Sequence, residues 1–142
     1  MSDNPMGFEG MLYSGVAGST ATTLLENCKD ITIGGDNAKG NTTVRGDSSV
    51  PPIETEDVTI RKLTIEFVML NSKTDTELER LKACAASGEA VALRGKDHAA
   101  GKGPDGDFTL SVSKPWPLEG EQVVTFSGSP TRGYGRAPLA YV

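Results

Sequence analysis

Residues 58 to 70 read Val-Thr-Ile-Arg-Lys-Leu-Thr-Ile-Glu-Phe-Val-Met-Leu, and this stretch decides the fold class. Leu63, Ile65, Phe67 and Met69 occur at every second position. A period of two is typical of a β-strand with one buried face, because successive side chains point to opposite faces of the sheet. Strands are usually about 5–6 residues long, so a strand over the whole of 58–70 indicates a large or extended sheet, which could continue beyond one subunit.

Further strand patterns lie on both sides of this stretch. We expect strands at 10–16, 28–33, 89–94, 108–113 and 122–127, and we expect the last two to pair like a hairpin. The chain also contains 17 glycines and 8 prolines, which favours a β-rich protein with prominent loops. The residues therefore predict a mainly β fold.

One helix is predicted, over residues 74–87. Thr74 is its expected N-cap, and Glu77 can reach back to it as in a capping box. Gly88 is placed as a C-terminal cap. The apolar stripe is narrow and consists of Leu78, Leu81 and Ala85. We expect this helix to cover one face of the sheet.

Residues 35–52 show no apolar periodicity and consist almost entirely of turn-forming and polar residues. Connections longer than about 12–15 residues are uncommon in compact domains unless they have a function or are disordered. The segment is therefore either an interaction arm or a floppy hairpin, and we favour the arm. A second loop rich in glycine and charge is expected at 95–107.

Length and charge limit the class of protein. The 142 residues predict one domain, which we place at 9–129, between a mobile N-terminal arm at 1–8 and a tail at 130–142. The net charge of −5 argues against tight binding of nucleic acid. Two cysteines and a start without a signal-peptide pattern predict reduced thiols and synthesis in a cytoplasm. No apolar stretch approaches the ~20 residues that span a bilayer, so we predict no membrane partner.

Residues for catalysis or metal binding do not cluster in the sequence. His98 is the only histidine and has no cysteine near it, so a catalytic triad and a histidine-based zinc site both lack parts. Residues 101–106 match the letters of a dinucleotide fingerprint, but a strand follows where the motif needs a helix. Cys84 is interpreted as a small packing residue. We predict no enzyme activity, no catalytic residue, no cofactor and no metal.

Four other patterns have a structural interpretation that we favour. Residues 45–47 spell Arg-Gly-Asp and 41–43 fit a glycosylation acceptor, yet both consist of common turn residues. The acidic segment 54–57 is interpreted as a solvated strand edge. Trp116 lies between two prolines, a context that favours a packed corner, with stacking on a ligand at a loop tip as the alternative.

The order of these elements resembles a known family. The resemblance rests on Lys-Asp-Ile-Thr-Ile at 29–33 before a long loop, Arg-Lys-Leu-Thr-Ile-Glu-Phe-Val-Met-Leu at 61–70, the helix opened by Thr-Asp-Thr-Glu-Leu-Glu-Arg-Leu at 74–81, and the late pair of strands. In this pattern the chain resembles the tail tube proteins of long-tailed bacteriophages and their prophage relatives, over roughly residues 9 to 128.

The resemblance implies a β-sandwich or barrel with one flanking α-helix and a long interaction loop. It implies subunits that form hexameric rings by joining their sheets, and rings that stack into a tube through which DNA passes without specific binding. It also implies a place in a virion tail, beside a tape measure, a tail tip and a terminator protein. In that family the long loop reaches an adjacent ring, which would give 35–52 its purpose.

Candidate contacts between subunits follow from the same resemblance, and we place them in the long loop and in the tail. The candidate residues are Asn37, Lys39, Asn41, Thr43, Arg45, Asp47, Arg132, Tyr134 and Arg136. Two alternatives remain open. One is a tube subunit of a type VI-like secretion system, which would share this architecture. The other is a β-sandwich module that binds a small ligand or a carbohydrate, for which Trp116 is the main aromatic candidate.

Overall fold

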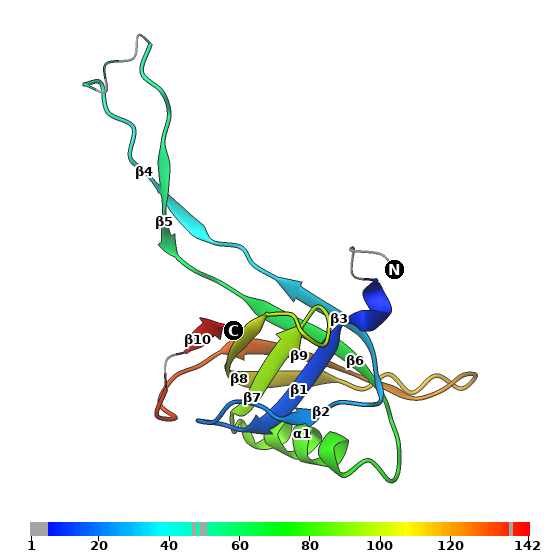
Figure 1. Cartoon of the computed structure of the whole chain (residues 1–142). Helices are drawn as coiled ribbons and strands as arrows, with labels where there is room; N and C mark the ends of the chain where they lie inside the picture. Colours follow the sequence, from blue (N-terminus) through cyan, green and yellow to red (C-terminus); the bar gives the residue numbers. More distant parts are fainter. Residues whose placement is uncertain (1–5, 47, 49–50, 137) are drawn as a thin grey trace.

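A curled antiparallel sheet and one helix build the body of the protein, and a long two-stranded arm projects from it (Figure 1). The computed structural model describes residues 6–46, 48, 51–136 and 138–142. The helical segments are η1 (Gly7–Glu9) and α1 (Thr76–Ser87). The strands are β1 (Met11–Val16), β2 (Thr23–Leu24), β3 (Cys28–Gly34), β4 (Ala38–Asn41), β5 (Glu56–Ile60), β6 (Thr64–Leu70), β7 (Val91–Lys96), β8 (Pro104–Ser113), β9 (Val123–Pro130) and β10 (Leu139–Tyr141).

The main sheet is one hydrogen-bonded path of strands in the order β2-β1-β7-β8-β9-β6-β3. Strand β10 is off this path and pairs with β8, and all the pairings between described strands are antiparallel. The predicted mainly β fold with one flanking helix is confirmed. The late pair of strands is confirmed as well, because β8 and β9 pair from Phe108 to Ser113.

The core lies inside the curled sheet and under α1. Ile65, Phe67 and Met69 are buried as their spacing predicts, and Phe67 stacks on Phe126 with ring centroids 5.1 Å apart. Buried Leu78 and Leu81 of α1 belong to the same cluster. Apolar burial of this kind is the main favourable contribution to folding, so these side chains hold the body together.

The stretch 58–70 is not one strand, contrary to the prediction. Strand β5 ends at Ile60 and pairs with β4 in the arm, whereas β6 begins at Thr64 and pairs with β3 and β9 in the body. The alternation of buried and accessible side chains belongs to β6, whereas every residue of β5 is exposed. The length of the stretch therefore marks a chain that passes from the arm into the body.

The loop boundaries also differ from the prediction. Strand β7 runs on to Lys96 and β8 already begins at Pro104, so the second loop covers only residues 97–103. The turn-forming residues Pro-Asp-Gly-Asp at 104–107 belong to a strand because β7 pairs with one edge of this segment and β10 with the other. At the N-terminus, residues 1–5 of the expected mobile arm lie outside the described residues, and η1 follows directly.

The N-cap of the helix lies one residue later than predicted, and the helix itself begins at Thr76. Asp75, not Thr74, is the N-cap, and its Oδ1 accepts the Leu78 amide at 3.2 Å. The Nδ2 of Asn27 donates to the second carboxylate oxygen at 2.7 Å, which holds Asp75 in the cap position. At the other end Gly88 closes the helix with φ 82°, a left-handed conformation that glycine adopts without strain.

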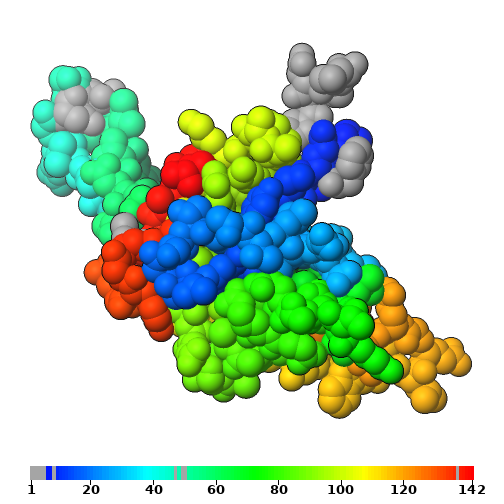
Figure 2. Space-filling view, turned by 60° about the horizontal axis from the view of Figure 1, so that its bottom comes forward, coloured from blue at the N-terminus to red at the C-terminus, as the bar shows by residue number. Residues whose placement is uncertain are grey.

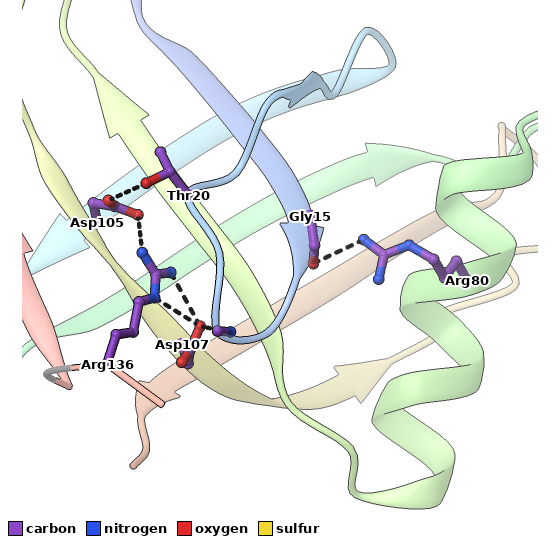
Figure 3. Close-up of polar contacts among 7 residues, drawn as sticks. Gly15, Thr20, Arg80, Asp105, Asp107 and Arg136 are labelled. Carbon is purple, nitrogen blue, oxygen red and sulfur yellow. Dashed lines mark hydrogen bonds and ion pairs between the residues drawn. The ribbon is translucent and has the colours of Figure 1, made fainter. Parts of the chain in front are cut away.

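Glu77 does not cap the helix, and its side chain instead links the helix to β1. Its carboxylate accepts hydrogen bonds from the buried hydroxyl of Ser14 on β1 and from Arg80. Arg80 in turn donates to the Gly15 carbonyl at 3.3 Å (Figure 3). These bonds tie the first two turns of α1 to β1.

Candidate assembly surfaces

The arm consists of residues 35–62 and stands out from the body (Figures 1 and 2). Its strands continue the body strands β3 and β6, and β4 pairs with β5. Beyond that pairing, the Thr42 amide donates to the Thr55 carbonyl at 2.9 Å and the two threonine hydroxyls lie 2.7 Å apart. The segment expected as an arm or a floppy hairpin is thus a projecting arm, and the part of it next to the body is a hairpin of β4 and β5.

Three of the predicted contact residues stabilise the arm itself. The Oδ1 of Asn37 accepts the Lys62 amide at 3.1 Å, and the Oδ1 of Asn41 accepts the Thr43 amide at 2.8 Å. Thr43 also accepts the Thr55 amide through its hydroxyl at 2.9 Å. A further two predicted residues, Lys39 and Arg45, are exposed, and Asp47 lies outside the described residues.

The arm also exposes large apolar side chains. Val44, Ile53, Val58 and Ile60 are each between 50% and 61% exposed. Val58 pairs with Lys39 and Ile60 with Ala38, so the shift of register between these two pairs places Val58 and Ile60 on different faces of the hairpin. A two-stranded hairpin by itself is at best marginally stable in water. An arm with apolar side chains exposed on both faces is suited to a partner that covers them.

The C-terminal segment 131–142 folds back onto its own chain. Strand β10 pairs with β8, and Val142 exchanges two backbone hydrogen bonds with Gly103 at 2.9 and 3.0 Å. Of the predicted contact residues here, Arg132 and Tyr134 are exposed. Arg136 instead turns inward to Asp105 and Asp107 (Figure 3).

Asp105 and Asp107 are nearly buried, with 6% and 1% of their surface exposed. The guanidinium of Arg136 donates to Asp105 at 3.1 Å and twice to Asp107, at 3.0 and 3.2 Å. Burial alone would lower the pKa of Arg136, but the bonds and charges of the two carboxylates outweigh this effect and raise the pKa. The Gly18 amide also donates to Asp107, at 2.9 Å. Arg136 is therefore held inside its own chain.

A second projection is the loop between β8 and β9, residues 114–122, which we name the tip. Figure 2 shows it standing out from the body in a different direction from the arm. Every residue of the tip is exposed, Trp116 at 68% and Leu118 completely. Trp116 thus lies at a loop tip, and the expected packed corner is wrong. The prolines on either side of Trp116 prevent regular pairing and stiffen the loop instead.

A groove of about 1200 Å³ opens beside β1, β3 and the end of β7. Its floor includes the buried Leu12 and Leu25, and its walls include Leu24, Ile33 and Tyr141, which are 41%, 41% and 72% exposed. Trp116 is not part of its lining, and Tyr141 is the lining's aromatic residue. The groove exceeds the ~300–1,000 Å³ of typical small-molecule pockets, so it suits a protein segment better than a small ligand.

The groove, the tip and the pair of buried aspartates were missed at the level of sequence. The groove depends on how the sheet curls, which no local pattern reveals. For the aspartates there was a signal, since Asp-Gly-Asp at 105–107 places two carboxylates directly before the alternating strand pattern of 108–113. For the tip, the signal was the run Pro-Trp-Pro-Leu between two strands.

The chemical groups considered earlier do not meet in one place. Within the described part of the chain, no group of three or more His, Cys, Asp or Glu side chains could hold a metal ion. His98 lies on the surface beside Asp97 at 2.7 Å, and Cys84 is buried in the core as expected. Burial and the charge of Asp30 raise the pKa of Cys28 to about 11, which keeps its thiol protonated. No described helix is long and apolar enough to cross a membrane.

Comparisons with known proteins give a match at the level of structure. No protein-family model and no curated protein matches the sequence. A chain of the tail of an empty gene transfer agent particle, a tail with C6 symmetry, superposes with a TM-score of 0.76 at 15% identity and 99% coverage of both chains. A chain of the virion of a native gene transfer agent particle gives 0.68 at 14% identity, again with 99% coverage of both. The protein thus has, over its whole length, the fold of a chain from the tail of a phage-like particle, as its resemblance to tail tube proteins implied.

Proposed function

We propose that this protein is a structural subunit that assembles into hexameric rings, and that the rings stack into the tube of a phage-type tail. The observation that carries the proposal is the fold shared over 99% of both chains with a chain of a C6-symmetric tail. A subunit that repeats in such a tail needs surfaces for its own copies. The exposed apolar residues of the arm and the tip are surfaces of that kind.

The arm is the proposed contact between rings. It extends the strands β3 and β6 away from the body, so it reaches further than any loop of the body does (Figure 1). Its apolar side chains are exposed in the single chain, and a copy in the next ring would cover them. The predicted contact residues Lys39, Arg45 and Asp47 would then lie in this contact, as would Arg132 and Tyr134 in a contact near the C-terminus.

DNA is the proposed cargo of the tube. The net charge of −5 per subunit fits a lumen that repels phosphates and lets them slide, because like charges oppose tight binding. We further propose a virion tail as the site of action, contacts there with tape measure, tail tip and terminator proteins, and synthesis in the cytoplasm of a bacterial host. The protein would act by its shape, without an enzymatic step.

Deleting the arm tests this proposal. Residues 38–60 are replaced with a short Gly-Ser turn, which keeps Asn37 and Lys62 and leaves the pairing of β3 with β6 in place. The body should stay folded, because the buried core lies outside the arm. The assay is negative-stain electron microscopy over a concentration series, with light scattering for mass and circular dichroism for folding.

The wild-type protein should form rings and tubes of uniform diameter, and the arm deletion should stop at single rings or subunits. The matched control is Val16→Ser, which changes an exposed apolar residue outside the arm, the tip and the groove and should assemble as the wild type does. Tubes of normal length from the arm deletion would contradict the role of the arm. A wild-type protein that stays monomeric at high concentration, even with seeds of assembled tails, would contradict the function itself.

A further inference from the structure

The tip and the groove are two apolar surfaces that one chain leaves uncovered. Trp116 and Leu118 stand on the tip, and Leu24, Ile33 and Tyr141 are exposed in the groove. Exposed apolar residues that gather at one place, with charged residues around them, mark interaction sites. Trp is among the residues that most often dominate binding energy in protein interfaces.

The tip cannot cover the groove of its own chain as it stands. Its base is fixed, because Lys29 pairs with Glu121 at 2.7 Å and Asn71 holds Gln122 by its side chain at 2.7 Å and by its backbone amide at 3.1 Å. Beyond this base all the tip residues are exposed, and they stand away from the body (Figure 2). An occupant from outside the chain is therefore needed.

Charge also favours the tip as the occupant of the groove. Lys96 and Lys102 lie on the groove wall formed by β7 and the turn after it, and neither makes an ion pair among the described residues. Glu26 and Asp30 lie on the wall of β3 and the segment before it. Each wall also holds one residue of the other sign, but Lys29 already pairs with Glu121 and Asp97 already contacts His98. The tip carries the same two signs on its two limbs, Lys114 before Trp116 and Glu119 after Leu118. Each limb therefore finds an opposite charge on one wall.

We propose that the tip of one copy of this chain docks in the groove of a second copy, with Trp116 and Leu118 against Leu24, Ile33 and Tyr141. The tip is prepared for docking, because Pro115 and Pro117 fix the backbone on either side of Trp116 and so reduce the entropy lost on binding. The contact is head to tail, since each copy supplies one tip and one groove. Contacts of this type close into rings when the rotation between copies allows it.

This inference deepens the proposed function, because it names the contact between neighbours in a ring, whereas the arm is assigned to the contact between rings. Two variants separate the partners of the contact. Trp116→Ser removes the tip's anchor and leaves the groove intact, and Leu24→Asp places a charge in the groove and leaves the tip intact. Both positions are exposed in the single chain, so both variants should fold, as circular dichroism will show.

The chain contains one tryptophan, so Trp116 reports its own environment through fluorescence. We expect a blue shift of wild-type emission as the concentration rises, and association about 30-fold or more weaker in each variant, which corresponds to the loss of one hot-spot residue. The decisive sample is an equimolar mixture of the two variants. In this mixture Leu24→Asp supplies the intact tip and Trp116→Ser supplies the intact groove. The mixture should therefore form dimers but no larger species, and the blue shift should return. Val16→Ser is the control, expected to behave like the wild type.

Different failures point to different errors. If the wild type forms tubes and Trp116→Ser does so equally well, the docking is wrong and the tube stands. If Leu24→Asp alone loses assembly, the groove holds another segment, such as the arm, and the docking is again wrong. If no tube forms but the mixture gives dimers with the blue shift, the docking stands and the tube is wrong. A mixture that stays monomeric while the wild type associates would overturn the docking.

Discussion

Removing the guanidinium of Arg136 should destabilise the fold strongly, although this residue is near the end of the chain. The change is Arg136→Met, which keeps most of the length of the side chain and removes its charge. Asp105 and Asp107 are then left at 6% and 1% exposure without their cation. Breaking a buried ion pair by removing one partner costs about 3–5 kcal/mol, because an uncompensated charge stays buried.

We expect a loss of about 3 kcal/mol, at the lower end of that range. Arg136 is 20% exposed, so water already screens part of the interaction. The carboxylates also keep two other donors, the Gly18 amide for Asp107 at 2.9 Å and the Thr20 hydroxyl for Asp105 at 3.4 Å. The measurement is the free energy of unfolding from urea denaturation followed by circular dichroism, at a concentration where the protein is monomeric.

Two controls decide the cause. Arg132→Met removes an exposed arginine of the same segment that has no ion pair among the described residues, and it should change stability by less than about 0.5 kcal/mol. Changing Asp105 and Asp107 to Asn in the Arg136→Met background removes the buried charges, and it should recover at least about 1.5 kcal/mol. A loss below about 0.5 kcal/mol for Arg136→Met, equal to that of Arg132→Met, would refute the argument, since the pair would then behave like a surface salt bridge.

Two further predictions concern single ionisable groups. Burial alone would raise the pKa of Glu77, but hydrogen bonds from Arg80 and Ser14 outweigh this effect and lower the pKa. Glu77→Gln should therefore cost about 1–2 kcal/mol at pH 7. Urea denaturation should show this difference shrinking as the pH falls below the ordinary pKa of a glutamate, because the wild-type carboxylate then becomes protonated. A difference that is constant from pH 7 to pH 3 would contradict this assignment. Burial and Asp30 raise the pKa of Cys28 to about 11, so little reactive thiolate is present at neutral pH. At pH 7.5, iodoacetamide should therefore alkylate Cys28 at least tenfold more slowly in the folded than in the urea-unfolded protein, as measured by mass spectrometry. Equal alkylation rates would contradict this prediction.

Local periodicity predicted the parts of the fold that depend on neighbouring residues. The alternation of Ile65, Phe67 and Met69 identified the central strand and its buried face, and Leu78 and Leu81 identified the buried side of the helix. Both patterns follow from burial of one face of a regular element, so they are visible in one segment alone. Gly88 likewise marks its own cap, because its φ of 82° favours glycine.

Features that depend on distant segments could not be predicted in this way. Residues 104–107 form a strand because β7 and β10 pair with them, although their letters indicate a loop. Asp75 replaced Thr74 as the cap because Asn27, far away in the sequence, holds its carboxylate. Arg136 was predicted at an interface from the resemblance alone, and its bonds to Asp105 and Asp107 could not be foreseen because these aspartates lie about 30 residues earlier in the sequence, on β8. In each case a contact between segments outweighed the local preference.

The apolar side chains that fold this chain are separate from those that we propose to join its copies. The buried cluster of the body includes none of the large apolar residues of the arm or the tip. Those residues stay in water when the single chain folds, so they contribute little to its stability. In the proposed assembly their burial, at about 25 cal/mol per Å² of apolar surface, would stabilise the contacts between copies. Substitutions in the arm and the tip should therefore change assembly and leave the unfolding of the monomer nearly unchanged, whereas substitutions at Arg136 or in the core act first on the monomer. This separation is what a subunit needs if it must be stable as a single chain and still bind its copies through the same sequence.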